Sequence, residues 1–596
     1  MIELEGVRNL VALFRAAADL EPDIAFLWAK QGGAWHPTSW HAARDAVDRL
    51  ARFLAAHGIQ AGDRVAIVSE NRPEWPIADL AILAAGAIVV PAYTTNTVED
   101  HFHILANSGA KAAIVSTAAL ADKLLPAAVR AELAFVVSIE RLAHPPQGLE
   151  IHCWEDALAL SASGPSPIAA RAEALQKDDT ACLIYTSGTG GAPRGVMLTH
   201  GNILTNCRST RTVLTALGLG HETFLSFLPL SHAYEHTAGL YFPISIGAEI
   251  YYAESADKLM ANMAEVHPSI CTAVPRLYEV LHQRVMATLK RASRLRRFLF
   301  DKALDLGLKR YHDPASLGLL DRLLDWVLEK AVRDKMRARF GGRLKALVSG
   351  GAALNPDIGL FFTALGLRLL QGYGQTESGP IVSVNPPHRI KMHTVGPPME
   401  GCQVRIAEDG EILVRGGMVM KGYWHDPEIT AATVRDGWLH TGDIGLLDED
   451  GYIRITDRKR DIIVLSGGDN VSPARVEGLL TLQPEIAQAM VSGDKKPYLV
   501  ALIVPDESLV HEFCHANGQP ADLASLSIDG TFRSALARVI DRVNKGQSPL
   551  ERIRAFTVAR EPFTTDNGQM TPTMKIRRHK IREEYGAEIE ALYGEK

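Results

Sequence analysis

The chain has 596 residues, which is too long for one ordinary domain and long enough to bury several hydrophobic cores. Its composition, 47% hydrophobic and 22% charged, is typical of a globular protein and excludes a mainly disordered chain. The 69 acidic and 63 basic residues give a net charge of −6. Because nucleic-acid binders usually carry a basic excess, we expect no nucleic-acid partner.

The six cysteines are scattered and include no C-x-x-C pair. This pattern argues against a zinc site or a disulfide framework and favours a reducing, cytoplasmic location. The first 20 residues are charged throughout and lack the apolar stretch of a secretory signal. No stretch of the sequence approaches the roughly 18 uninterrupted apolar residues of a membrane-spanning helix, so we expect no such helix.

The first 280 residues alternate apolar, strand-like runs with amphipathic helical stretches. Residues 64–69 (RVAIVS) are expected to form a buried strand, residues 76–85 a helix that ends before Gly86, and residues 88–90 another short strand. Such βα alternation is typical of layered α/β architecture with a largely parallel sheet.

Residues 284–339 form a predicted helical excursion that is strongly basic at its start, and a second helix is expected over residues 317–336. Its early cations are Lys290, Arg291, Arg294, Arg296 and Arg297. A charge run of this kind is usually a solvated face. The alternative is a peripheral membrane contact through residues 284–300, at the inner, anionic surface where fatty acids partition.

A domain boundary is expected near Asp457. The segment before it, residues 437–452, is rich in Gly and Asp as loops are, and a smaller mixed α/β region follows. We predict an N-terminal domain over residues 1–457 and a C-terminal domain over residues 458–596, joined by the sequence DRKR at residues 457–460.

The first motif with chemical meaning covers residues 185–200, which read YTSGTGGAPRGVMLTH. Glycines allow the backbone N–H groups to approach a phosphate, and nearby hydroxyl groups and Arg194 add further donors. It is not a Walker A loop, and Pro193 occupies the position of the third glycine in G-x-G-x-x-G. Alone, such a loop is more often a plain turn.

Further blocks follow in order: LPLSHAYEH at 228–236, SGGAA at 349–353, QGYGQTES at 371–378, TGD at 441–443 with Asp457-Arg458, and DNGQMTPTMKIR at 566–577. Singly, each has a structural explanation: Asp443 as a turn former, Tyr373 as core packing, His232 as a buried histidine. Together they resemble the adenylate-forming superfamily. The resemblance implies its fold: a large α/β N-terminal domain of several subdomains and a small, mobile α+β C-terminal domain.

The resemblance also implies a role for each matching residue. Arg194, where the family usually has lysine, His232, Glu377 and Lys575 are the expected catalytic residues, and Glu377 and Thr189 are expected to hold Mg²⁺. Arg460 is the expected hinge, and the CoA path is assigned to Ser466, Gly467 and Gly468. The expected ATP- and AMP-binding residues are Thr186, Ser187, Gly188, Thr189, Gly190, Gly191, Gly350, Gly351, Ala352, Tyr373, Gly374, Thr376, Asp443 and Arg458.

The implied reaction uses ATP, Mg²⁺ and CoA: a carboxylate attacks the α-phosphate and releases pyrophosphate, and the CoA thiol then attacks the acyl-adenylate. Two anions meet in the first step, so catalysis must come mainly from positioning and charge neutralisation.

The helical excursion, VPRLYE at 274–279 and the C-terminal sequence look like those of long-chain fatty acid–CoA ligases, which implies a long-chain fatty acid as substrate. The alternatives are a fatty acyl-AMP ligase, a CoA ligase for another carboxylic acid, and a peptide-synthetase adenylation domain, which a carrier domain would normally follow. A non-catalytic lipid- or nucleotide-binding relative is the alternative from another class.

Overall fold

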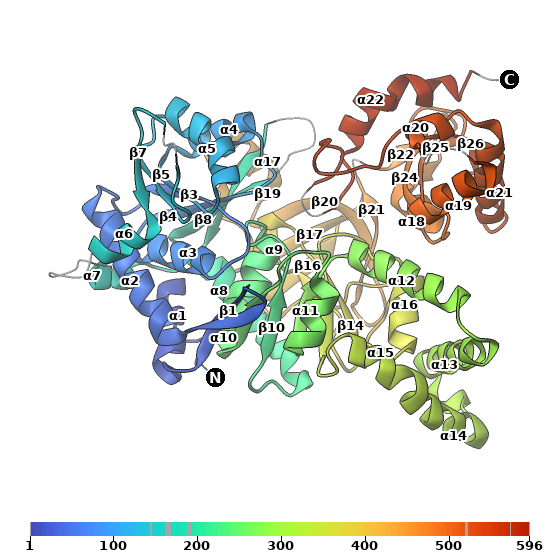
Figure 1. The fold of residues 1–596 in the computed structure, drawn as a ribbon, viewed down its shortest axis with the longest axis horizontal. Coiled ribbons are helices and arrows are strands. Elements are labelled where there is room, and N and C mark those ends of the chain that lie inside the picture. The colour runs from blue at the N-terminus through green and yellow to red at the C-terminus, as the bar shows by residue number, and fades with distance from the viewer. Residues whose placement is uncertain are drawn as a thin grey trace.

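The structure is a computed structural model that describes residues 2–143, 146–160, 168–186, 192–459, 461–518, 522–571 and 574–594. Two eight-stranded sheets form the centre of the larger, N-terminal part of the chain (Figure 1). Among the described residues, no helix combines the length and the apolar character needed to cross a bilayer.

The first sheet contains the strands that the sequence predicts near residues 64–69 and 88–90. These two strands and the helix between them confirm the expected βα alternation, because β3 pairs in parallel with both β4 and β5. Only β9 and β18 at one end run antiparallel to their neighbours. In spatial order the strands are β18 (Gly422–Tyr423), β9 (Arg194–Thr199), β8 (Thr180–Thr186), β4 (Ile88–Ala92), β3 (Arg64–Val68), β5 (Ala110–Val115), β6 (Phe135–Ser138) and β7 (Glu150–Cys153).

The second sheet has six neighbouring strands in parallel, β14 to β1, with an antiparallel strand at each end. Its order is β15 (Ser383–Val384), β14 (Leu369–Tyr373), β13 (Ala346–Ser349), β12 (Ile270–Ala273), β10 (Thr223–Ser226), β11 (Glu249–Tyr252), β1 (Ala25–Gln31) and β2 (Ala34–Ser39). Parallel strands align their carboxyl ends, so the loops that follow them gather at one edge.

Helices cover and join these sheets. The predicted helix at 76–85 is α3 (Glu74–Ala84), followed by Gly86 with a positive φ of 80°. The other helices of this part are α1 (Leu10–Leu20), α2 (Trp40–Ala56), α4 (Val98–Ser108), α5 (Ala118–Arg130), α6 (Trp154–Leu160), α7 (Ile168–Ala174), α8 (His200–Leu214), η1 (Thr215–Leu217), α9 (Ala233–Glu235), the π-helical η2 (His236–Tyr241), α10 (Phe242–Ile246), α11 (Leu259–Val266) and α16 (Pro356–Ala364).

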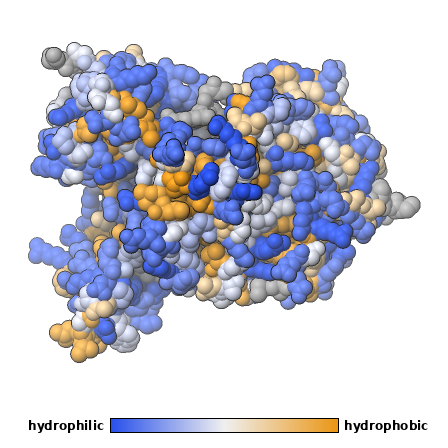
Figure 2. All heavy atoms as spheres, turned by 180° about the vertical axis from the view of Figure 1, so that it is seen from behind, coloured by the Kyte–Doolittle hydropathy of each residue, from blue (hydrophilic) through white to orange (hydrophobic). Residues whose placement is uncertain are grey.

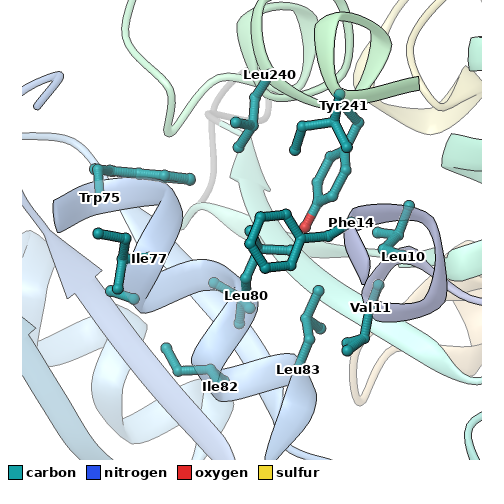
Figure 3. Packing of buried hydrophobic residues seen from close by; sticks show 14 of the residues in the cluster. Leu10, Val11, Phe14, Trp75, Ile77, Leu80, Ile82, Leu83, Leu240 and Tyr241 are labelled. Atoms are coloured by element: carbon teal, nitrogen blue, oxygen red, sulfur yellow. The ribbon is translucent and has the colours of Figure 1, made fainter. Parts of the chain in front are cut away.

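The main hydrophobic core lies between the two sheets, where α1 meets α3 (Figure 3). Phe14 and Leu80 point toward Tyr241 of η2, and all three side chains are buried. The Tyr241 hydroxyl donates to the buried Asp79 carboxylate, which also lies 3.1 Å from His236 Nε2. This packing fixes η2, which lines the site described below.

The helical excursion expected over residues 284–339 is present, although its first helix begins earlier than predicted, at Pro275. The predicted helix at 317–336 is divided, because a π-helical turn, η4, interrupts it. The elements are α12 (Pro275–Lys290), α13 (Arg294–His312), η3 (Pro314–Ser316), α14 (Leu319–Leu328), η4 (Glu329–Arg333) and α15 (Asp334–Arg339).

A third, five-stranded sheet leads to the smaller C-terminal part, whose elements α18 to α22 lie together at one side of the molecule (Figure 1). The third sheet contains β16 (Cys402–Ile406), β17 (Glu411–Gly416), β20 (Trp438–Leu447), β19 (Val434–Arg435) and β21 (Ile453–Arg458), with η5 (Thr376–Ser378) and α17 (Pro427–Thr433) nearby in the chain. The C-terminal elements are β22 (Ile463–Val464), β23 (Asn470–Val471), α18 (Pro473–Thr481), β24 (Ile486–Ser492), β25 (Leu499–Pro505), α19 (Glu507–Asn517), α20 (Leu523–Leu526), α21 (Gly530–Asn544), β26 (Ile553–Val558) and α22 (Arg578–Ala591).

Candidate active site

A cavity of about 2380 Å³ lies between the N-terminal sheets and the C-terminal part. Ligand pockets are typically about 300–1,000 Å³, so this one has room for more than one substrate. Residues from every predicted block line it: Thr186, Arg194, His232, Gly350, Gly351, Tyr373, Gly374, Thr376, Glu377, Asp443, Arg458 and Lys575.

Strand ends explain why blocks so far apart in sequence meet here. Strand β13 ends at Ser349 and its parallel neighbour β14 at Tyr373, so the glycines that follow each strand lie at the same sheet edge. Gly374 has a packing reason to be glycine, because a Cβ there would lie 1.8 Å from the Pro380 carbonyl oxygen. Helix α16 follows soon after Gly351: Asn355 is its N-cap and accepts a hydrogen bond from the Asp357 backbone N–H, and Pro356 is its first residue.

Asp443 is held from two sides. The Tyr373 hydroxyl donates to its Oδ2 at 2.6 Å, and Arg458 Nε donates to its Oδ1 at 3.0 Å. The second contact follows from strand register, since Asp443 and Arg458 are paired residues of β20 and β21. Burial, and then the charge of Asp443, raises the pKa of Tyr373 well above its ordinary value, so the hydroxyl stays a donor. A carboxylate has about four lone-pair positions, so Asp443 can still accept from ribose hydroxyls.

Glu377 sits on the 3₁₀ turn η5 and is half-buried. Its Oε1 accepts a hydrogen bond of 2.8 Å from the Tyr423 hydroxyl. Among the described residues, none forms a hydrogen bond or ion pair with Oε2, and the neighbouring Thr376 also borders the cavity. Carboxylate and hydroxyl oxygens are hard ligands of the kind that Mg²⁺ prefers, so this pair fits that ion.

His232 is the N-cap of α9, where its Nδ1 accepts a hydrogen bond of 3.2 Å from the Tyr234 backbone N–H. Burial, followed by the positive charge of Lys575, lowers the pKa of His232 to about 4. The ring is therefore neutral near pH 7. With Nδ1 as acceptor, the single ring proton belongs on Nε2, which makes that atom a donor at the cavity wall.

Lys575 is the contribution of the C-terminal part to the cavity. Burial and the nearby Arg458 guanidinium lower its pKa to about 8, while the carboxylates of Asp443 and Asp461 oppose the shift. Its ammonium group therefore lies near enough to His232, Arg458 and Asp443 for their charges to interact with it. A desolvated cation in this position is suited to stabilise negative charge that develops on a phosphate.

Part of the cavity lining, here called the apolar arm, is contributed by α8, η2, α10 and strands of the second sheet. The wall on one side is the π-helical turn η2 and the start of α10. π-helical turns often occur at functional sites. The arm has two threonine hydroxyls and no charged group among its residues, which are Thr210, Leu214, Phe224, Ala238, Phe242, Ile270, Thr272, Val348 and Val384.

Comparison with known families matches residues 13–424 to the description "AMP-binding enzyme" and residues 460–596 to "AMP-binding enzyme C-terminal domain". The chain belongs to the AMP-binding enzyme family. The expected resemblance to adenylate-forming enzymes, and the large and small domain that it implies, are thereby confirmed.

Curated relatives of this AMP-binding enzyme cover nearly its whole length. It is 34% identical over 579 residues to the long-chain-fatty-acid–CoA ligase FadD15 of Mycobacterium bovis, covering 96% of this chain and 95% of that one. It is 30% identical to the peroxisomal long chain acyl-CoA synthetase 6 of Arabidopsis thaliana, covering 92% and 80% of the two chains.

Solved structures share the fold of this AMP-binding enzyme at lower identity. The adenylation domain of a carboxylate reductase from Mycobacterium chelonae has a TM-score of 0.78 at 23% identity, covering 99% of this chain and 92% of that one. O-succinylbenzoate CoA synthetase from Bacillus subtilis, solved with ATP and magnesium, has a TM-score of 0.68 at 21% identity, with 96% and 99% covered.

Other predicted site residues either fall outside the described part of the chain or do not line the cavity. Ser187, Gly188, Thr189, Gly190, Gly191 and Arg460 fall outside the described residues. Ala352 is exposed and does not line the cavity, unlike the two glycines before it. Ser466, Gly467 and Gly468 form an exposed turn between β22 and β23, also away from the cavity.

Two site residues were missed from the sequence. Tyr423, which holds Glu377, is 46 residues further along the chain, and nothing in the sequence around it indicates this contact. Asp461, which borders the cavity and opposes the pKa shift of Lys575, directly follows the expected hinge residue Arg460.

Proposed function

We propose that this AMP-binding enzyme activates a long-chain fatty acid. The fatty acid carboxylate attacks the α-phosphate of ATP, giving the acyl-adenylate and pyrophosphate, and the CoA thiol then takes the acyl group and releases AMP. The observation that carries the proposal is the joint cavity: Lys575 of the C-terminal domain, the Tyr373–Asp443–Arg458 cluster and an apolar arm all border it.

In the first step, some residues would position ATP and others would neutralise the charge of its phosphates. Tyr373 and the Gly350–Gly351 wall would hold adenine, and Asp443 would accept from the ribose hydroxyls. Lys575 and Arg194 would bring positive charge to the phosphates, and Arg194 reaches the cavity from the start of β9 with Asp426 3.5 Å away. Electrostatic stabilisation of this kind is usually the largest catalytic contribution in such a reaction.

His232 would meet the substrate at the junction of the adenylate site and the apolar arm. A neutral imidazole with its proton on Nε2 can donate a hydrogen bond to a carboxylate oxygen without adding charge. It would orient the attacking carboxylate toward the α-phosphate, and orientation alone can supply several kcal/mol.

Glu377 and Thr376, together with the expected ligand Thr189, would hold Mg²⁺. The ion, when bound, neutralises charge on the phosphates and on the leaving pyrophosphate. The Tyr423 hydrogen bond leaves one oxygen of the Glu377 carboxylate available and fixes the direction in which it points.

The apolar arm supports an aliphatic acyl chain as the substrate. An alkyl tail offers no polar handle, so its site needs only shape and apolar surface. The arm meets this requirement, with Ala238, Phe224 and Phe242 among its walls. The curated relatives that align with most of this chain are named as long-chain acyl-CoA ligases or synthetases. Their names support the same substrate class.

The second step is proposed to require movement of residues 458–596 relative to residues 1–457, with Arg460 at the hinge. Lys575 would leave the cavity, and the exposed turn at Ser466–Gly468 would approach it and line the path of CoA. Lys575→Ala should then abolish adenylate formation and retain thioester formation from supplied acyl-AMP. Equal loss of both half-reactions would contradict domain alternation.

We further propose that the enzyme acts in the cytoplasm, at the inner face of the membrane, where long-chain acids partition. The six cysteines are all free, which suits a reducing compartment. The basic start of the helical excursion supports a peripheral contact with anionic lipid.

A carboxylate panel tests the proposed reaction. Acetate, octanoate, palmitate, oleate and benzoate would each be supplied with ATP and Mg²⁺, with and without CoA, while AMP and thioester are measured together. CoA-dependent thioester that peaks with the long-chain acids is expected. Adenylate without thioester would mean a fatty acyl-AMP ligase, activity with short or aromatic acids would overturn the substrate, and failure to bind ATP would mean a non-catalytic relative.

A further inference from the structure

Helix α14 exposes most of its leucines and its tryptophan. Leu319 and Leu320 are 85% and 83% exposed, Leu323 is 63% exposed and Trp326 is 66% exposed. Figure 2 shows a hydrophobic patch at the lower left end of the molecule, in the place that α14 of Figure 1 occupies after the half-turn. Monomeric proteins seldom leave such contiguous apolar surface in water unless it binds something.

Helix α14 turns its apolar side toward solvent, whereas an ordinary surface helix turns that side toward the protein core. At 100° per residue, its six exposed apolar side chains fall within an arc of about 160°, and its acidic residues occupy the opposite side. Asp325 is buried and pairs with Arg333 at 2.7 Å and with Arg310 at 3.1 Å. The apolar arc therefore points away from the protein because ion pairs hold the other side against it.

Arg333 makes this orientation rigid. Its guanidinium is fully buried, and besides Asp325 it donates to the Ala364 and Ala303 carbonyl oxygens, each at 2.8 Å. These contacts tie α14 to α13 and to α16. The α13–α16 contact is itself close, since a Cβ on Gly307 would lie 2.3 Å from the Ala364 oxygen. A fixed platform thus presents the apolar arc.

Charge around the platform differs from that of the rest of the chain. Residues 284–339 contain fifteen Lys and Arg against seven Asp and Glu, a net charge of +8. The whole chain carries −6, so the remaining residues carry −14. Residues 290–297 contain five exposed cations and the exposed Leu295. The first turns of α13 lie near α14, because Leu299 and Leu328 share one small core.

We propose that the exposed face of α14 is the anchor by which this protein docks on an anionic phospholipid bilayer, with the cations of residues 290–297 held against the lipid headgroups. Leucines and a tryptophan are the residues that enter the boundary between headgroups and acyl chains, and nearby Lys and Arg add electrostatic attraction. A second copy of the chain is the less suitable occupant, because its own +8 platform would be repelled. The anchor adds residues 319–327 to the membrane contact expected through residues 284–300.

The inference deepens the proposed function, because it names the surface from which a long-chain acid would be drawn, and it rests on that function for its purpose. Docking itself needs no turnover. A binding measurement therefore separates failure of the anchor from failure of the proposed reaction.

The test is flotation of the full chain with vesicles of equal parts phosphatidylcholine and phosphatidylglycerol, and with vesicles of phosphatidylcholine alone. The anchor variant is Leu320→Glu with Leu323→Glu, both at exposed positions that contribute little to the fold. The matched control is Ile528→Glu, which removes an equally exposed side chain (81%) in the C-terminal part. Circular dichroism and thermal unfolding confirm that all three proteins fold alike.

We expect the parent chain and the control to bind the mixed vesicles, and the anchor variant to bind about tenfold or more weakly. Binding should fall with added salt and be weak on phosphatidylcholine alone. Quenching by brominated lipid should be reduced in Trp326→Phe. Equal binding by the parent and the anchor variant would overturn the proposal. So would a dimer that the anchor substitutions dissociate, because a second copy would then cover this face.

Discussion

The depressed pKa of Lys575 predicts how adenylate formation depends on pH. Burial and Arg458 bring this pKa from its ordinary 10.5 to about 8, and only the protonated form can stabilise charge on the α-phosphate. The kcat/KM for ATP in the adenylation half-reaction, which reports the free enzyme, should be constant below about pH 8 and fall about tenfold per pH unit above it. Pyrophosphate release at saturating palmitate measures it.

Two variants test whether the fall in kcat/KM above about pH 8 is caused by Lys575. Lys575→Ala should lose about 10²–10³-fold in adenylation at pH 7, the usual cost of removing one group that stabilises transition-state charge. Lys575→Arg keeps a cation whose pKa exceeds about 12, so the fall above pH 8 should vanish even though the maximal rate is lower. A fall near pH 8 that persists in Lys575→Arg would refute the assignment to this lysine.

Stability should move in the opposite direction over the same pH range. The folded pKa lies below the unfolded value, so between about 8 and 10.5 the unfolded chain binds more protons and stability rises with pH. The full effect is at most about 3 kcal/mol, at 1.36 kcal/mol per pH unit. Lys575→Met should remove this rise and be the more stable protein at pH 7. Parallel pH profiles of unfolding for the two proteins would contradict it.

Three further outcomes are expected. Arg333→Met should lower the free energy of unfolding by about 3–5 kcal/mol in a denaturant titration, because Asp325 loses its buried partner and keeps only the more exposed Arg310; an unchanged midpoint would mean that the ion pair is not structural. Ala238→Trp should narrow the apolar arm and lower kcat/KM for palmitate by about tenfold or more relative to octanoate, and a uniform loss would place Ala238 outside the acyl path. Asp443→Asn should raise KM for ATP about 10–100-fold through a weakened hydrogen bond to ribose, with Tyr373 still seated against the amide; an unchanged KM would exclude this contact.

The centre of the site was predicted through the family resemblance, because each local block alone also had a structural explanation. The structure adds the physical reason why Gly350, Gly351 and Tyr373 lie together: they are at the ends of the parallel neighbours β13 and β14. Lys575 came from the same resemblance. The closeness of Lys575 to Arg458, Asp443 and Asp461 could not have been predicted, because it depends on how the C-terminal domain packs against the N-terminal domain.

The exposed side of α14 could not be predicted from the sequence, for a different reason. The run LLDRLLDWVL has a clear apolar side, and an apolar side normally predicts burial. What reverses it is Arg333, whose guanidinium is bonded to an oxygen 31 residues away in α16 and pairs with Asp325. A contact between one buried cation and a distant backbone carbonyl leaves no periodic trace in the sequence. The leucines are therefore exposed although their spacing is that of a core helix.

The cost of burying Lys575 also gives a direction to the proposed domain movement. While ATP occupies the cavity, phosphate charge compensates the ammonium and favours the closed arrangement. After pyrophosphate leaves, less negative charge remains to offset a desolvated cation that also faces the Arg458 guanidinium. The closed arrangement then becomes less favourable, and withdrawal of Lys575 into water relieves it. The same desolvation that makes Lys575 effective in the first step thus favours its departure before the second.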